Sequence, residues 1–205
     1  MAVITISREL GSEGDRIAEL ICAELGYQWV DKAILAQMAQ ESGMDEEAIL
    51  ALERSIPTRA RFTSTDMRSL YSKQPGAWEK KAALDDETYR RIVRETMERY
   101  ATAGNAIIIG RGGQMVLRDH PAALHVHLYA LAELRAQRIA QRMAISEQEA
   151  ARRIAASDEE KRLFIRYMHD NANWKDAKYY HLMINTGAIS PEVAARIIML
   201  AAQAR

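Results

Sequence analysis

Short apolar runs alternate with stretches of helical periodicity along most of the chain. Strands are expected at residues 2–7, 27–30, 106–109, 124–129 and 182–185, where aliphatic and β-branched residues follow one another. Between these runs, apolar residues recur every three or four positions, which is typical of amphipathic helices that cover a sheet. This alternation predicts an α/β fold, with a five-stranded parallel sheet flanked by crossover helices.

Serine residues mark helix starts in the second half of the chain. Ser146 and Ser157 are each followed three positions later by a glutamate, which is the pattern of a capping box. The two boxes predict a helical hairpin over residues 146–169. Ser190 precedes Pro191, which favours an N-cap with proline at the first helical position. We expect this last helix to pack through Val193, Ile197, Leu200 and Ala201.

Residues 54–78 interrupt the pattern. Pro57, Pro75 and Gly76 punctuate this stretch, which is rich in serine, threonine and basic residues. Two interpretations stay open, in about equal measure. The stretch is either an inserted, mobile substrate-binding region of a single domain that spans residues 1–205, or a solvated linker.

Composition narrows the classes of partner. Lysine and arginine total 28, as do aspartate and glutamate, so the net charge is zero. A general nucleic-acid or membrane binder would be distinctly basic, so neither partner is expected. The single cysteine excludes a disulfide-based fold. No apolar run approaches the ~20 residues of a membrane span, and the apolar start is too short for a signal peptide. We expect a cytoplasmic protein.

The most informative stretch is residues 3–14, in which a strand runs into a loop with two glycines and then into a helix. Such a loop aims backbone N–H groups at a phosphate, and the helix N-terminus adds partial positive charge. An ordinary strand-to-helix turn is the simpler alternative. The residues expected to contact a bound phosphate group are Arg8, Gly11, Ser12, Glu13, Gly14, Asp15 and Arg16.

The loop departs from the full phosphate-loop signature. G-x-x-x-x-G-K-[ST] would place a lysine directly after Gly14, where this chain has Asp15. No serine or threonine follows to hold Mg²⁺ in the usual way. Arg16 or Arg8 could replace the missing positive charge. A dinucleotide-binding loop is disfavoured because G-x-G-x-x-G is absent.

An ordered set of motifs, which runs through nearly the whole chain, resembles the cytidylate kinase-like branch of the P-loop nucleoside monophosphate kinases. The motifs are Ile4-Thr5-Ile6-Ser7-Arg8-Glu9-Leu10-Gly11-Ser12-x-Gly14-x-x-Ile17-Ala18, Asp31-Lys32-x-Ile34-Leu35, Ile109-Gly110-Arg111-Gly112-Gly113, residues 131–142 and Ile184-Asn185-Thr186. The resemblance implies a P-loop kinase-like fold, ATP with Mg²⁺ on the glycine loop and an arginine-bearing lid. It also implies transfer of the ATP γ-phosphoryl group to a nucleoside monophosphate, with CMP or dCMP the first expectation.

The resemblance also implies roles for single residues. Arg111 would hold the acceptor's phosphate, and Asp31 would orient the acceptor or a metal-bound water. Arg153 and Arg162 are candidates for the lid, within residues 146–169, where they would clamp the phosphates as catalytic groups. The alternative is that they are surface charges paired with neighbouring carboxylates. The helix at 131–142 carries Arg135, Arg138 and Arg142 on one face, and one or more could turn toward the cleft.

Two observations keep alternatives open. The chain reads Ile109-Gly110-Arg111-Gly112 where cytidylate kinases read D-G-R-D, so both flanking carboxylates are absent and the metal ligands stay unassigned. Together with the missing lysine, this leaves room for a catalytically silent nucleotide-binding or sensor protein, or for a kinase of another small metabolite. His125 and His127 would share one face of a strand, where structural roles are favoured over metal binding.

Overall fold

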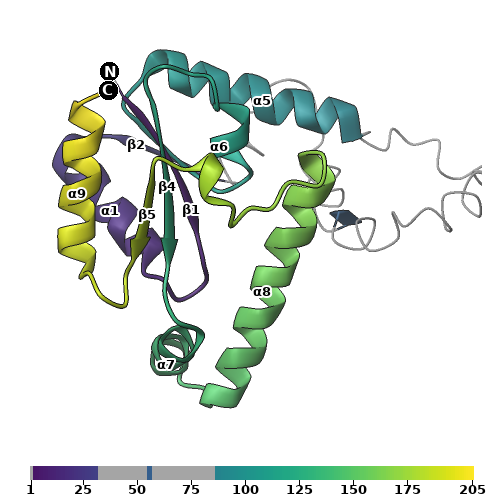
Figure 1. The fold of residues 1–205 in the computed structure, drawn as a ribbon, viewed down its shortest axis with the longest axis vertical. Coiled ribbons are helices and arrows are strands. Elements are labelled where there is room, and N and C mark those ends of the chain that lie inside the picture. The colour runs from purple at the N-terminus through teal and green to yellow at the C-terminus, as the bar shows by residue number, and fades with distance from the viewer. Residues whose placement is uncertain (1, 32–54, 57–85) are drawn as a thin grey trace, which may run out of the picture.

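The computed structural model describes residues 2–31, 55–56 and 86–205. Most of the predicted insertion at 54–78 therefore lies outside the described residues. Five parallel strands form one sheet in the order β2-β3-β1-β4-β5, which confirms the predicted fold class (Figure 1). The strands are β1 (Val3–Arg8), β2 (Gln28–Val30), β3 (Ala106–Ile109), β4 (Ala123–Tyr129) and β5 (Leu182–Asn185).

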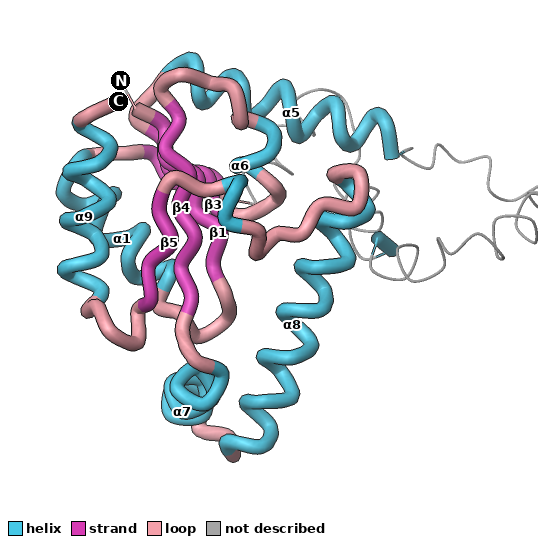
Figure 2. The backbone as a smooth tube through the Cα atoms, in the orientation of Figure 1, coloured by secondary structure: helices cyan, strands magenta, loops and turns pink. Residues whose placement is uncertain are grey.

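Helices cover both faces of the sheet. The α-helices are α1 (Gly14–Leu25), α5 (Asp86–Ala103), α6 (Gly113–Val116), α7 (Ala132–Met143), α8 (Glu147–Met168) and α9 (Pro191–Gln203). α1 and α9 lie on one face, and α5, α6 and α8 lie toward the other, while α7 lies beyond the carboxyl ends of the strands (Figures 1 and 2). Among the described helices, none is long and apolar enough to cross a bilayer.

The alternation of side chains along β1 builds a core on each face. Ile4 and Ile6 are fully buried against α1 and α9, and Val3 is buried against the side of α5. Thr5 and Ser7 point to that second side as well, so a short polar row lies under α6 and the segment after α8. The middle strand is therefore apolar on one face and partly polar on the other.

The predicted hairpin at 146–169 is wrong, because α8 is one continuous helix of 22 residues. Ser146 is its N-cap and accepts a hydrogen bond from the N–H of Glu149 at 3.2 Å. Ser157 lies in the middle of the helix. Two apolar stretches of α8 pack on different partners: Ile154 packs with α7, and Phe164 packs with the core beside α5. Packing at both ends of the helix outweighs the weak helix-start signal at Ser157.

The predicted packing face of the last helix is also wrong, by one residue. α9 buries Ala194, Ile198 and Ala202 against the sheet and α1, whereas Val193 is 47% exposed and Leu200 is 70% exposed. Alanines allow α9 to approach α1 closely, which the bulkier set would prevent. Its predicted start is confirmed, since the Ser190 hydroxyl accepts from the N–H of Val193.

Candidate functional site

The loop between β1 and α1 turns at Gly11, whose φ is 84°, and enters the helix through Glu13 at φ 59°. Ser12 is buried and closes the turn, because its N–H and its hydroxyl both donate to the carbonyl oxygen of Glu9, at 3.2 and 2.8 Å. Glu13 makes no side-chain cap, unlike the serines that cap α8 and α9. The first N–H groups of α1 thus lack a capping side chain, which favours an anion there.

Arg8 lies across this loop. Its Cβ and Cγ occupy the space above Gly14, where an added Cβ would come within 2.6 Å of both atoms. Its Nε is 3.0 Å from Oδ1 of Asp15, and its Nη1 lies against Gly110 at the end of β3. Only glycine at position 14 allows this close approach. Arg8 therefore brings its guanidinium to the place between the loop and the neighbouring strand end.

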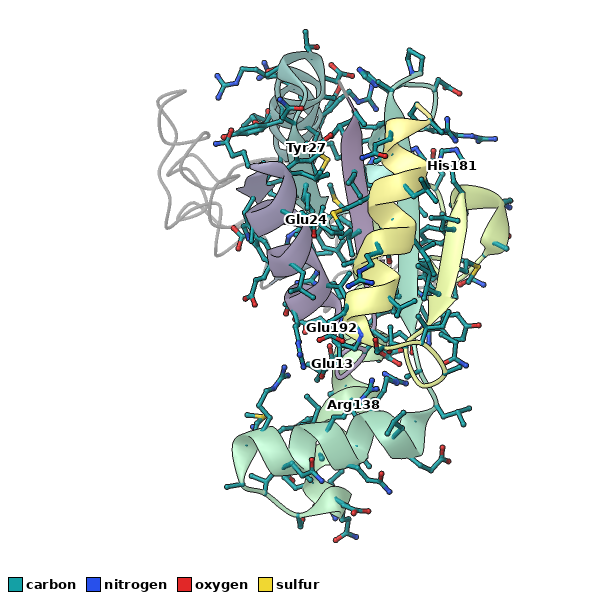
Figure 3. The ribbon with its side chains drawn as sticks, turned by 90° about the vertical axis from the view of Figure 1, so that its left-hand side faces the viewer. Glu13, Glu24, Tyr27, Arg138, His181 and Glu192 are labelled. Atoms are coloured by element: carbon teal, nitrogen blue, oxygen red, sulfur yellow. The ribbon has the colours of Figure 1, made fainter. Side chains whose placement is uncertain are left out.

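Arg16, the other predicted replacement for the lysine, points elsewhere. Its Nη2 is 2.6 Å from Oε1 of Glu192 at the start of α9, and its side chain is 57% exposed. Figure 3 shows Glu13 and Glu192 near each other, where the N-terminal ends of α1 and α9 approach α7. Of the two arginines, the structure brings only Arg8 over the loop.

A network of ion pairs around the buried Arg135 and Glu9 holds the inner side of the loop in place. Arg135 is 5% exposed, and its Nε lies 3.2 Å from Oε2 of Glu9. Its Nη2 reaches Oδ2 of Asp158 on α8 at 3.1 Å. Lys175 joins the same two carboxylates, at 2.5 Å from Glu9 Oε1 and 3.4 Å from Asp158 Oδ2. This network fastens β1, α7, α8 and the segment after α8 to one another, so Arg135 is structural in this conformation.

The next arginines of α7 face the other side of the loop. Arg138 donates to the carbonyl oxygen of Gly11 at 3.2 Å and to that of Thr186 at 2.8 Å, which ties the loop to the end of β5. Figure 3 shows Arg138 pointing from α7 toward this junction. An open depression of about 530 Å³ adjoins it. The depression is lined by Glu13, Arg16, Arg138, Gln141, Arg142 and Pro191.

Arg111 follows β3 in an unusual turn. Gly110, Arg111 and Gly112 all have positive φ, at 75°, 51° and 74°. For a non-glycine residue this backbone is costly, and such strain concentrates at functional sites. α8 supports the turn twice. The Arg111 guanidinium lies 4.8 Å from the ring centre of Phe164, and a ring N–H of His169 donates to the Arg111 carbonyl. His169 also fills the space beside Gly112.

The remaining predicted residues are spread more widely. Arg153 and Arg162 lie on α8 in exposed pairs, with Glu149 at 3.0 Å and with Glu159 at 2.7 Å. In this conformation they form the surface pairs that were the alternative. Asp31 directly follows β2, the strand that pairs with β3, and is half-buried.

His125 and His127 lie opposite Thr5 and Ser7 in the register of β4 and β1. Each imidazole is buried and bonds the hydroxyl beside it through Nδ1, at 2.8 and 3.3 Å. Burial lowers the pKa of each to about 4, so both are neutral near pH 7. Within the described ranges, no three His, Cys, Asp or Glu side chains gather as metal ligands would.

Sequence reasoning missed a cationic group around Trp174. The indole is buried, and it has the ammonium of Lys175 5.0 Å and that of Lys161 5.8 Å from its ring centre. Lys161 follows Asp158 by one helical turn, so a carboxylate–lysine spacing on α8 was the available signal. The pattern gave no reason to prefer it to other charge pairs on that helix.

Comparison with known proteins agrees with this geometry. The model of the cytidylate kinase-like family matches residues 3–188. A cytidylate kinase of Pyrococcus horikoshii is 29% identical over 201 residues, covering 97% of this chain and 87% of that protein. One of Ignicoccus hospitalis is 27% identical, covering 97% of both. An uncharacterized protein from Eubacterium ventriosum has the same fold, with a TM-score of 0.70 and 16% identity over 100% of this chain and 99% of that one. The chain belongs to the cytidylate kinase-like family.

Proposed function

We propose that this protein is a cytoplasmic phosphotransferase that moves the γ-phosphoryl group of ATP to a nucleoside monophosphate, with CMP or dCMP first among the acceptors. One observation carries the proposal. Arg8 lies over the glycine loop, where α1 begins without a side-chain cap, and it also reaches the end of β3, which Arg111 follows. Two cationic side chains thus flank the carboxyl edge of a parallel sheet, where ligands bind in open α/β folds. Family membership supports the same reaction class.

The donor would bind with its phosphates on the loop. Backbone N–H groups at the start of α1 would receive the phosphate oxygens. The depression beside the loop would receive the nucleoside, because it opens between Glu13 and Arg138 and has room for a base and a sugar. Arg142 and Arg16 also line this depression, and their positive charges suit the phosphate tail of the nucleotide.

Phosphoryl transfer asks the protein for alignment and for cancellation of charge rather than for a nucleophile. Arg111 would hold the acceptor's phosphate, and Arg8 would face the transferring group. Arg153 and Arg162 would add to the clamp from α8. Each would first leave an exposed ion pair, which contributes little because water screens it, whereas a bidentate phosphate contact is a strong charge-assisted interaction. Their pairing in this conformation therefore does not compete strongly with such a role.

Mg²⁺ fits this site as a companion of ATP rather than as a resident ion. Protein cages for Mg²⁺ are uncommon, and one or two carboxylates with substrate phosphates and water usually suffice. Glu9 and Asp158 are engaged by Arg135 and Lys175, whereas Asp15 is 58% exposed at the loop. Asp15 is thus the carboxylate that would face a metal, and Mg²⁺ would supply charge neutralisation there.

The test is ADP release with ATP, Mg²⁺ and each nucleoside monophosphate in turn. We expect turnover with at least one pyrimidine acceptor, and a loss of 100-fold or more in kcat/KM in Arg111→Ala, in line with the removal of a charged transition-state contact. Absence of turnover with every acceptor would remove the proposed activity.

A second candidate is a nucleotide-binding protein that does no chemistry. It is favoured by Asp15, which stands in the lysine position and engages Arg8. Calorimetric binding of ATP without turnover would support it. A third, a kinase of another small metabolite, would show ADP release in a metabolite screen but with no nucleotide acceptor.

A further inference from the structure

Lys161 lies within α8, and its ammonium lies near the ring of Trp174 rather than in an ion pair with a carboxylate. It forms a cation–π contact with that indole at 5.8 Å from the ring centre. No ion pair joins it to any carboxylate of the described residues. A partly desolvated cation without a direct counterion is unusual and calls for an anion.

The charges that face Lys161 come from every element around it. Arg8 of β1 and Arg135 of α7 repel it, and Asp158 and Asp15 attract it. Both carboxylates are already committed, Asp158 to Arg135 and Lys175, and Asp15 to Arg8. Lys175 lies on the same indole, and the neutral imidazole of His127 lies nearby. The positive charges at this end of the loop thus exceed what the carboxylates neutralise.

We propose that Lys161 and Arg8 form a phosphate-binding pair, in which Lys161 supplies from α8 the positive charge that a lysine after Gly14 would supply in a complete phosphate loop. The inference rests on the proposed function for its context, but it concerns polyphosphate binding alone. The ammonium of Lys161 would contact the terminal phosphates of the donor, and Arg8 would exchange Asp15 for phosphate oxygens.

The protonation state of Lys161 should make phosphate binding by this pair depend on pH. Burial and then Arg8 lower the pKa of its ammonium to about 8. A phosphate placed beside it would favour the protonated form and raise that pKa. Polyphosphate should therefore bind better to the protein below pH 8, where Lys161 is charged, and this contribution should fade as the pH rises through 8. An arginine at the same position would keep its charge throughout.

The experiment is calorimetric titration of the whole chain with sodium tripolyphosphate, without acceptor or metal. We expect Lys161→Ala to weaken binding about tenfold or more, as the loss of a charge-assisted contact does. Lys161→Arg should bind nearly as well as the wild type at pH 7 and should bind better than the wild type at pH 9. Lys178→Ala is the matched control, since Lys178 is exposed and pairs with Asp176 at 3.0 Å.

Several outcomes would overturn the proposal that Lys161 and Arg8 bind phosphate together. One is equal affinity in Lys161→Ala and Lys178→Ala. Another is the same pH dependence in the wild type and in Lys161→Arg, which folds with its charge kept. Failure of tripolyphosphate to bind the wild type would also overturn it. Lys161-dependent binding without ADP release in any acceptor assay would uphold the pair and remove the phosphotransferase, so the two proposals fail separately.

Discussion

Glu9 has the most instructive environment of any single residue in the loop. A carboxylate in a phosphate-binding loop should repel the ligand, yet Glu9 is 6% exposed and turned inward. Arg135 and Lys175 neutralise it, and its Oε2 also accepts from the N–H of Ala130 at 3.4 Å. The carboxylate of Glu9 thus holds the loop in place, and Arg8 remains on the outer side of the loop.

Removing Arg135 should therefore damage the fold. Arg135→Met would leave the buried Glu9 and the half-buried Asp158 with only Lys175 between them, so we expect a loss of about 3–5 kcal/mol in the free energy of unfolding. Urea denaturation measures this loss. Arg153→Ala is the control, since its exposed pair should contribute no more than ~0.5 kcal/mol. Similar losses in both variants would contradict the structural role of the network.

The buried histidines predict a pH dependence of stability. The pKa values of His125 and His127 are lowered to about 4 in the folded protein, below the ~6.5 of an unfolded histidine. The unfolded chain therefore binds more protons as the pH falls below 6.5, and stability is lost between pH 6.5 and 4. We expect a loss of roughly 2 kcal/mol for each histidine between pH 7 and 5.

Urea denaturation at several pH values between 7 and 5 checks this expectation. The double variant with His125→Asn and His127→Asn keeps a polar atom near each Nδ1 but cannot titrate. Its free energy of unfolding should depend much less on pH than that of the wild type. An unchanged slope in the double variant would sink the explanation.

At the scale of elements, α8 does the most to organise the site. It contributes Asp158 and Lys161 to the loop, and Phe164 and the following His169 to the turn of Arg111. A hairpin with a break at Ser157 would leave these residues on its second helix, but it would separate them from Ile154, which packs α8 on α7. One continuous helix instead holds the side chains beside the glycine loop, those beside Arg111 and the contact with α7 in one arrangement.

The two serines of the predicted capping boxes should behave differently. Ser146→Ala removes a cap whose hydroxyl accepts from Glu149 N–H, and it should cost about 1 kcal/mol in the free energy of unfolding. Ser157→Ala lies within the helix, where alanine is the better helix former, and it should be neutral or stabilising by up to ~0.5 kcal/mol. Equal losses would indicate a helix start at 157.

Phe164 should matter for the acceptor more than for the donor. Phe164→Leu removes the ring beneath the Arg111 guanidinium, and we expect the KM for the acceptor monophosphate to rise about three- to tenfold while the KM for ATP stays the same. Ile165→Val, another buried change on α8, is the control for lost packing. A parallel rise in both KM values would show a general loosening instead.

For the whole molecule, the strands were predictable and their side-by-side order was not. The runs at 106–109 and 182–185 became β3 and β5 with those bounds, since short runs dominated by apolar residues favour buried parallel strands. Sequence spacing could place Arg135, Arg138 and Arg142 on one face of α7. It could not tell that Arg135 is buried among carboxylates from distant elements, because long-range partners leave no local pattern.

Some parts of the candidate site could likewise be predicted from the sequence, and other parts could not. The turns at the glycine loop and at Arg111 could be predicted, because glycines at the end of a strand leave a local signature, while the binding roles of these residues stay predictions. Lys161, Lys175 and Trp174 could not be predicted, because their proximity depends on how α8 and the segment after it cross the sheet. The sequence left Arg8 and Arg16 open as replacements for the lysine, and the structure separates them, because Arg8 approaches Gly14 and Gly110 whereas Arg16 pairs with Glu192.

The central claim is that Arg8 and the loop around Gly14 form a seat for the phosphates of ATP. Calorimetric titration of MgATP into the wild type and into Gly14→Ala tests it most directly, with Glu24→Ala, at the far end of α1 in Figure 3, as the control. An added Cβ at position 14 would displace Arg8, so we predict one site in the wild type and at least ~10-fold weaker binding in a folded Gly14→Ala. Undetectable binding to the wild type at millimolar ATP, or equal affinity in Gly14→Ala, would contradict the account.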